Sequence, residues 1–198
     1  MLVLAIDVAV SGCAVAILDC ETSVSYIKNM ETERGQAEHL IPLIEEVVRE
    51  SGHVMQDINI IAVTRGPGSF TGVRIGLSTA RTLGLALNIP VFGVSTLDAL
   101  AKNHINAIKT LFLIDTKRGD YYGQVGLGGQ PKIWTEDDVS NYQGPIVKDA
   151  VPDIACVAHM GADMYVEQVG YDIKNAPSPL YLRDAEVSES KKKPLQVL

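Results

Sequence analysis

The sequence predicts an α/β protein in which apolar strands lead into helices and the pattern starts again in the second half. The run INIIAVT at 58–64 has the composition of a strand that is covered on both faces. A glycine-rich turn and a long apolar helix follow it, as in proteins whose helices pack on a sheet. The stretch 110–127 then repeats the order strand, aspartate, turn and strand that opens the chain.

Three short strands and a helix are expected before residue 58. The strands lie at 2–7, 12–19 and 23–29, and their short connections favour antiparallel neighbours. The segment 36–50 has the apolar stripe of an amphipathic helix, and Gly52 is placed to end it. Pro42 either lies near the first turn of this helix or kinks it.

The segment 65–87, RGPGSFTGVRIGLSTARTLGLAL, is the most distinctive in the chain. Gly66 and Gly68 permit a sharp turn into a helix whose first N–H groups lack partners and attract phosphate or carboxylate. Capping by Ser69 or Thr71 without any ligand explains the same residues about equally well. The glycine spacing fits neither the Rossmann fingerprint nor the Walker A loop.

A ladder of small residues continues along one face of this helix, four residues apart: Gly72, Gly76, Ala80 and Gly84. Each glycine inside a helix costs about 1 kcal/mol relative to alanine, so three on one face indicate a specific close contact. We expect a helix–helix contact with a partner or with a second copy of the chain. Packing against the protein's own sheet is the alternative.

The remaining elements divide the chain into two lobes. A strand at 91–94 and a helix from Thr96 to His104 complete the first lobe, 1–105. A smaller lobe at 106–183 is expected to hold a hairpin of 110–115 and 120–127 with its turn at Lys117-Arg118-Gly119, a strand at 154–158 and a helix at 161–169. Residues 184–198 form a polar tail.

The repeated pattern places Asp7 and Asp115 at corresponding strand ends. Two lobes that face each other would aim both carboxylates at one cleft, an arrangement suited to the metal and phosphates of a nucleotide. The alternative is that each aspartate serves only its own turn, because aspartate is common in turns. Spacing alone favours this alternative.

Composition and charge narrow the classes of function. The 198 residues carry a formal net charge of −7, which disfavours binding of nucleic acid by this chain alone. Without a signal-peptide pattern or an uninterrupted apolar span, we expect a cytoplasmic protein whose three cysteines are reduced. None of the four histidines forms a zinc motif, and no serine occupies a nucleophile elbow. This sparse catalytic inventory favours a binding role.

RGPGSFTGVRIG followed by STARTLGLAL closely resembles the signature of the bacterial TsaB (YeaZ) family. Further matches are LAID, QAEHLIPLI, GVSTLDALA and LIDTKRGDYYGQV, and Pro179 to Arg183 resembles the family's C-terminal PxYLR element. The resemblance covers about residues 1–183. It implies a two-lobed fold like those of actin, sugar kinases and heat-shock chaperone ATPases, an RNase H-like fold with a reduced C-terminal lobe.

The resemblance also implies a non-catalytic subunit for the synthesis of N6-threonylcarbamoyladenosine beside the anticodon of tRNAs that read ANN codons. TsaB proteins pair with the transferase TsaD, are joined by the ATPase TsaE and meet tRNA only through that complex. Alone they form homodimers through their first two helices, here about 36–51 and 71–88. The resemblance implies no metal, no membrane and no cofactor of the chain's own, with ATP or ADP at the partner interface.

Two groups of residues become candidates on this basis. The partner or dimer interface is expected to include Arg34, His39, Ile44, Gly72, Gly76, Ala80 and Gly84. The residues expected near a nucleotide are Asp7, Gly66, Gly68, Ser69, Thr71 and Asp115. The segment 93–100, GVSTLDAL, lacks the H-x-x-x-H metal motif of TsaD-type enzymes, which argues against a transferase or a protease. The alternative function is a stand-alone ATPase or phosphotransferase of the actin-like superfamily that uses Asp7 and Asp115.

Overall fold

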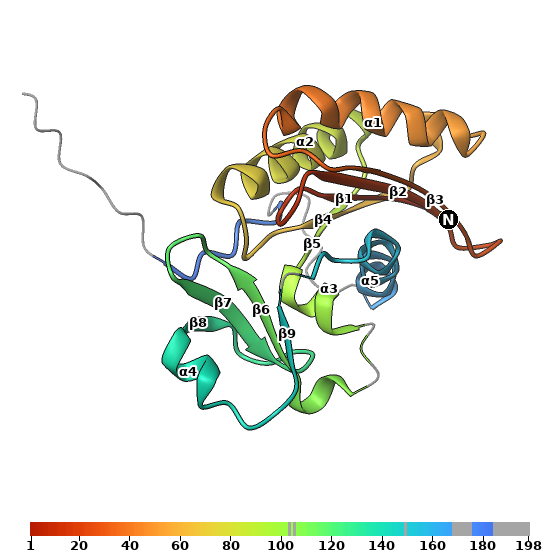
Figure 1. Cartoon of the computed structure of the whole chain (residues 1–198). Helices are drawn as coiled ribbons and strands as arrows, with labels where there is room; N and C mark the ends of the chain where they lie inside the picture. Colours follow the sequence, from red (N-terminus) through yellow and green to blue (C-terminus); the bar gives the residue numbers. More distant parts are fainter. Residues whose placement is uncertain (103, 105, 149, 168–175, 184–198) are drawn as a thin grey trace, which may run out of the picture.

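Two sheets, one of five strands and one of four, form the framework of the protein in the computed structural model (Figure 1). The structure describes residues 1–102, 104, 106–148, 150–167 and 176–183. The polar tail expected at 184–198 lies outside the described residues. Within the described part, no helix is both long enough and apolar enough to cross a membrane.

The first sheet has the strand order β3-β2-β1-β4-β5. Its strands are β1 (Leu2–Asp7), β2 (Cys13–Asp19), β3 (Val24–Met30), β4 (Ile60–Thr64) and β5 (Val91–Val94). The first three pair antiparallel, whereas β1, β4 and β5 pair parallel. The predicted strands and the predicted antiparallel pairing are confirmed.

Helices cover both faces of this sheet (Figure 1). On one face lie α1 (Gln36–Glu50) and α2 (Phe70–Leu87), and on the other lie α3 (Thr96–Lys102) and α5 (Ile154–Val166). The prediction for 36–50 is confirmed, and Pro42 lies inside α1. Two short 3-10 helices, Met55–Asp57 and Ala107–Lys109, precede β4 and the second sheet.

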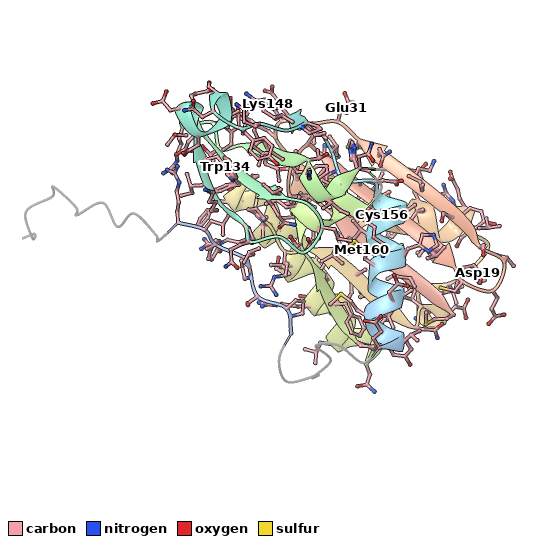
Figure 2. The ribbon with its side chains drawn as sticks, turned by 90° about the horizontal axis from the view of Figure 1, so that it is seen from below. Asp19, Glu31, Trp134, Lys148, Cys156 and Met160 are labelled. Atoms are coloured by element: carbon pink, nitrogen blue, oxygen red, sulfur yellow. The ribbon has the colours of Figure 1, made fainter. Side chains whose placement is uncertain are left out.

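The strand predicted at 154–158 is wrong, because this segment begins helix α5. Asp153 caps the helix by accepting a hydrogen bond from the N–H of Ala155 at 3.0 Å. Buried residues then recur at helical spacing and pack on the first sheet: Ile154, Val157, Ala158, Gly161 and Ala162. A Cβ on Gly161 would lie 2.4 Å from the Cβ of Ala62, so the helix sits very close to β4. Figure 2 shows α5 with Cys156 and Met160 lying across the sheet.

The second sheet has the order β8-β7-β6-β9. Its elements are β6 (Leu111–Asp115), β7 (Asp120–Val125), β8 (Lys132–Thr135), α4 (Glu136–Ser140) and β9 (Ile146–Lys148). The predicted β6–β7 hairpin is confirmed as an antiparallel pair. The sequence did not indicate β8, α4 or β9, since each is at most five residues long and glycines precede them.

The two sheets repeat one plan. In each, an antiparallel hairpin, β1–β2 or β6–β7, is followed by a strand parallel to its first member, β4 or β9. The lobes are less evenly divided than expected, because α5 returns to the first sheet although it follows the second in the chain. The second lobe therefore consists mainly of residues 111–148.

Candidate functional site

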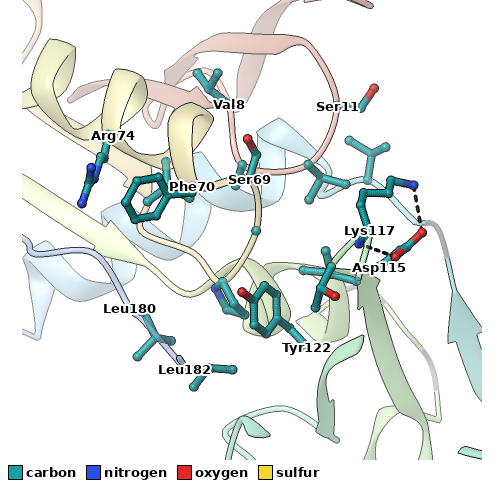
Figure 3. A pocket seen from close by; sticks show the side chains of 18 of the residues that line it. Val8, Ser11, Ser69, Phe70, Arg74, Asp115, Lys117, Tyr122, Leu180 and Leu182 are labelled. Atoms are coloured by element: carbon teal, nitrogen blue, oxygen red, sulfur yellow. Dashed lines mark hydrogen bonds and ion pairs between the residues drawn. The ribbon is translucent and has the colours of Figure 1, made fainter. Parts of the chain in front are cut away.

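A pocket of about 980 Å³ lies between the two lobes (Figure 3). Four segments from distant parts of the chain form most of its wall: the β1–β2 turn at 8–12, the entry to α2 at 67–70, the β6–β7 hairpin at 114–118 and the C-terminal segment at 180–183. The site therefore depends on the relative placement of both sheets and of the chain's later residues.

The entry to α2 is held by a side-chain cap. The Ser69 hydroxyl accepts a hydrogen bond from the N–H of Gly72 at 3.2 Å, and the Ser69 N–H donates to the carbonyl of Ala9 at 2.7 Å. The capping role considered for Ser69 is therefore present in the structure. Thr71 is exposed and is not among the residues that line the pocket.

Two glycines let the β1–β2 turn touch the start of α2. A Cβ on Gly68 would lie 2.2 Å from the carbonyl oxygen of Ala9, and one on Gly72 would lie 2.0 Å from that of Val8. No side chain fits at such distances, so the turn and the helix meet backbone to backbone. Gly66 is buried with φ at 97°, a conformation that favours glycine, and its carbonyl accepts a hydrogen bond from the N–H of Thr96.

The ladder of small residues on α2 faces the protein's own sheet, which corrects the expected helix–helix contact. Gly72, Gly76, Ala80 and Gly84 are all buried. A Cβ on Gly76 would touch Val8 and Val63, and one on Gly84 would lie 2.3 Å from a methyl of Val91. These residues shape a close helix–sheet contact and leave the outward face of α2 to other side chains.

The other three residues expected at the interface are one buried residue and two exposed ones. Ile44 on α1 is 1% exposed and belongs to the core between α1, α2 and the sheet, so its expected place at an interface is also corrected. Arg34 and His39 are exposed at the start of α1.

Asp7 is buried at the end of β1 and does not line the pocket. Its Oδ1 accepts hydrogen bonds from the N–H of Ala9 at 2.9 Å and the hydroxyl of Thr64 at 2.5 Å, while Oδ2 has no partner within the described residues. Burial raises the pKa of this carboxyl above 3.8, although the hydrogen bonds from Thr64 and the backbone act in the opposite direction.

Asp115 occupies the corresponding position in the second sheet but lines the pocket. Its Oδ1 accepts from the N–H of Lys117 at 2.6 Å, and its Oδ2 lies 2.9 Å from the Lys117 ammonium (Figure 3). These contacts lower the pKa of the Asp115 carboxyl. Both aspartates thus accept the amide two residues on, as expected for turn aspartates. The two carboxylates do not converge on one cleft.

Of the residues expected near a nucleotide, Gly68, Ser69 and Asp115 line the pocket, whereas Asp7, Gly66 and Thr71 do not. Across the residues that the structure describes, no three His, Cys, Asp or Glu side chains gather as a metal site would require. Cys13, Cys20 and Cys156 are free thiols in the structure.

A cluster at the pocket rim was not predicted. The Arg74 guanidinium lies 3.6 Å from the centre of the Phe70 ring, and its Nε donates to the Tyr181 hydroxyl at 2.8 Å. The Phe70 and Tyr181 rings are 5.7 Å apart. Arg74 and Tyr181 are 107 positions apart, so no local pattern could predict their contact. The PxYLR-like element was the sequence feature that pointed to the segment containing Tyr181.

Residues 176–183, here called the C-terminal strap, join the lobes. Arg81 donates to the carbonyl of Pro177 at 3.0 Å, and the N–H of Leu180 donates to the carbonyl of Arg65 at 2.8 Å. At its far end, Arg183 forms a partly buried ion pair with Asp120 at the start of β7. The strap therefore runs from the α2 side of the first lobe to the hairpin of the second.

Comparison with known proteins gives the family. The family model described as TsaD, tRNA N6-adenosine threonylcarbamoyltransferase, matches residues 27–141, more than half of the chain. A protein of Escherichia coli (strain K12) named tRNA threonylcarbamoyladenosine biosynthesis protein TsaB is 38% identical over 137 residues, 68% of this chain and 58% of that protein. The Bacillus subtilis (strain 168) protein of the same name is 34% identical over 128 residues, 62% of this chain and 53% of that protein. The chain thus spans little more than half the length of these curated relatives.

Solved structures agree with the fold. A Pseudomonas aeruginosa structure, described as an uncharacterized protein with similarity to peptidase YEAZ, matches with a TM-score of 0.80 and 22% identity, covering 92% of this chain and 99% of that one. A second structure, YeaZ from Pseudomonas aeruginosa, matches with a TM-score of 0.77 at 22% identity, covering 91% of this chain and 99% of that one. The α/β fold predicted from the sequence, with a second sheet in the later half of the chain, is confirmed.

Proposed function

Because the chain belongs to the TsaD family, on its TsaB (YeaZ) branch, we propose that it is a non-catalytic subunit for the synthesis of tRNA threonylcarbamoyladenosine. It docks to a TsaD-type transferase, supports that enzyme together with TsaE, and acts in the cytoplasm on tRNAs that read ANN codons. The observation that carries this proposal is the match over 27–141 together with relatives named for the modification. The missing H-x-x-x-H motif at 93–100 supports the non-catalytic role.

The outward faces of α1 and α2 are the proposed docking surface. The two helices lie side by side on the same face of the first sheet (Figure 1). Ile41 on α1 is a large apolar side chain that is 42% exposed, and Ser78 and Thr82 are exposed on α2. Arg34 and His39 lie at the start of α1, where they edge this surface. In the absence of the transferase, a second copy of the chain covers the same surface.

The docking test compares exposed residues on the proposed surface with an exposed residue outside it. Ile41→Glu combined with Thr82→Arg places charges on the proposed surface without touching the buried ladder of α2. We expect the purified double variant to remain folded, to lose co-purification with the transferase and to lose its stimulation of threonylcarbamoyladenosine formation. Ile108→Glu is the control, because Ile108 is 87% exposed in the 3-10 helix before the second sheet. An intact complex from the double variant would refute the placement.

ATP or ADP is proposed to bind in the pocket between the lobes once the transferase has docked. A volume of about 980 Å³ suits a nucleotide, and the Ser69 hydroxyl and the 115–118 turn supply polar groups in its wall. Ser11→Trp would fill this pocket, whereas Ser140→Trp on α4 changes an exposed site on the second lobe. Fluorescent ADP should bind the complex, bind the Ser140 variant complex equally, and fail with the Ser11 variant. Equal binding by the isolated chain would contradict the requirement for a partner.

A stand-alone ATPase or phosphotransferase is the second candidate, favoured by one observation: Asp115 lines a pocket of nucleotide size. The hypothesis that Asp115 and Asp7 act together on a nucleotide is weakened, since Asp7 is buried and does not line the pocket. ATP turnover by the isolated chain that disappears in Asp115→Asn would establish this function. If ATP is hydrolysed no faster than in buffer without protein by both the parent and the Asp115 variant, the stand-alone enzyme is excluded and the subunit role remains.

A further inference from the structure

A second pocket, of about 330 Å³, lies beside the strap and contains one positive and one negative side chain. Within the described residues it is lined by Arg65, Gly93, Val94, Ser95, Asp98, Gln124, Gly128, Gly129, Pro131, Met160, Met164 and Leu180. We call it the Arg65–Asp98 pocket. Among the described residues, Leu180 alone lines both this pocket and the larger one.

Arg65 is positioned by the hydrogen bonds of its backbone and by its close packing on Gly93, which has no side chain. Its N–H donates to the carbonyl of Val94 at 2.9 Å, and its carbonyl accepts from Leu180 at 2.8 Å. A Cβ on Gly93 would lie 3.0 Å from Cδ of Arg65, so the aliphatic stem passes over this glycine. In the part of the chain that the structure describes, the guanidinium makes neither a hydrogen bond nor an ion pair. The cation is therefore held in place and available to a ligand.

Asp98 is oriented by two hydrogen bonds to one of its oxygens. Oδ1 accepts from the amide of Gln124 at 2.7 Å and from the N–H of Gly128 at 2.9 Å. Gln124 is only 1% exposed, and its amide also donates to the carbonyl of Gly126 at 2.8 Å. No described residue donates to Oδ2. The carboxylate is thus fixed through a buried side chain while one oxygen stays available.

The remaining wall suits a short side chain. Met160 and Met164, from α5, contribute thioethers that adapt to small apolar groups (Figure 2 shows Met160). Arg65 and Asp98 are the only charged side chains among the described lining residues, and no ion pair joins them. A ligand that contacts both offers an anionic group to Arg65 and a hydrogen-bond donor to Asp98, and a carboxylate and an ammonium on a small frame meet these two requirements.

We propose that the Arg65–Asp98 pocket binds a free α-amino acid. The ligand carboxylate pairs with the Arg65 guanidinium, its ammonium pairs with Oδ2 of Asp98, and a short aliphatic side chain packs on Met160 and Met164. This inference does not depend on the proposed docking to a transferase, because every group that it uses belongs to the isolated chain.

The test follows the methyl groups of methionine by NMR in the isolated full chain labelled with 13C-methyl methionine. Addition of L-valine should shift Met160 and Met164 and leave Met1, Met30 and Met55, which lie outside the pocket, in place. Isovalerate keeps only the carboxylate of valine, and isobutylamine keeps only its amine. Both should bind about tenfold or more weakly, since each loses one charged contact. L-threonine, isosteric with valine, tests whether the Ser95 hydroxyl adds affinity.

Substitutions of Arg65 and Asp98 test whether these two side chains bind the charged groups of L-valine. Arg65→Gln and Asp98→Asn keep the backbone contacts of Arg65 and the accepting oxygen of Asp98, and each should weaken L-valine binding about tenfold or more. Arg49→Gln and Asp137→Asn are matched exposed controls on α1 and α4 that should bind as the parent does. Methyl spectra report whether each variant is folded. The proposal is overturned if L-valine moves neither pocket methionine, if the single-charge analogues bind equally, or if folded Arg65 and Asp98 variants bind as tightly as the parent.

Discussion

The Thr64 hydroxyl donates a 2.5 Å hydrogen bond to Oδ1 of Asp7, joining the ends of two parallel strands inside the core. The same oxygen of Asp7 accepts a hydrogen bond from the N–H of Ala9. Because Thr64 holds the Asp7 carboxyl in place, it also holds the β1–β2 turn, which forms one wall of the interlobe pocket. Two side chains that never reach the pocket therefore set the position of its wall.

Removal of the Thr64 hydroxyl should destabilise the fold. In Thr64→Val the buried carboxylate of Asp7 loses its side-chain donor, and we expect the free energy of unfolding to fall by about 1–3 kcal/mol in urea denaturation. Thr96→Val is a matched control, because Thr96 is equally buried and its Oγ1 has no hydrogen-bond partner among the described residues. Equal losses in the two variants would show that the Asp7 contact carries no special weight.

The burial of Asp7 predicts a pH dependence of stability. Since the folded pKa lies above 3.8, the folded protein binds more protons than the unfolded chain between those two pKa values. The contribution of Asp7 to the free energy of unfolding therefore falls as pH rises through this window and stays low above it. Asp7→Asn removes the ionisation, so its stability should decline less than that of the parent from about pH 4 to about pH 7. Parallel pH curves for the two proteins would contradict the prediction.

Two alanine substitutions on one face of α2 should have opposite effects. Gly72→Ala places a methyl 2.0 Å from the carbonyl oxygen of Val8, and the forced displacement should cost about 1–3 kcal/mol. Gly76→Ala places its methyl 3.5 Å from Val8, an ordinary contact, and should stabilise the helix by about 0.5–1 kcal/mol. Thermal and urea unfolding measure both. A stable Gly72→Ala protein would mean that the turn and the helix are free to separate.

The ion pair between Arg183 and Asp120 should hold the strap on the second lobe. Arg183→Gln removes the charge, and we expect the N–H of Leu180 to exchange with solvent about tenfold faster, since its hydrogen bond to Arg65 depends on a docked strap. Hydrogen exchange followed by mass spectrometry gives this rate. Arg49→Gln on α1 serves as the control, and unchanged exchange at Leu180 would show that the strap is anchored elsewhere.

The thiols should differ in reactivity. Burial raises the pKa of Cys156 to about 11 and also raises the pKa of the buried Cys13 and the half-buried Cys20. Because the thiolate is the reacting form, iodoacetamide at neutral pH should modify Cys20 first and reach Cys13 and Cys156 only after unfolding. Peptide mass spectrometry identifies the order, and early labelling of Cys156 would indicate that α5 leaves the sheet.

Local patterns predicted the first lobe well because its elements carry their signals in adjacent residues. The antiparallel strands have short connections, and α1 has an unbroken apolar stripe. The prediction of a strand at the start of α5 failed because residues 155–158, ACVA, have no polar face. Over so short an apolar run, the sequence pattern does not distinguish a strand from a helix. The Asp153 cap was the signal that distinguished them.

The candidate site was less predictable because its geometry depends on contacts between distant residues. The ladder on α2 correctly indicated a close approach, but spacing cannot say whether a partner or the protein's own Val8 lies opposite. The turn role of Asp7 was visible, whereas its burial is set partly by Thr64, 57 positions away. Phe70, Arg74 and Tyr181 lie in segments that the sequence analysis singled out, but no local pattern indicated that these three side chains meet at the pocket rim.

The position of the strap late in the chain has a consequence for the order in which surfaces form during synthesis. Residues 1–102 contain the five-stranded sheet with α1 and α2, so the proposed docking face exists as soon as this part has folded. The larger pocket must wait for the hairpin at 111–125 and then for residues 180–183. A nascent chain could thus engage its partner before it has any pocket to fill, and loading of the pocket would show that residues 180–183 have been made and have folded into place.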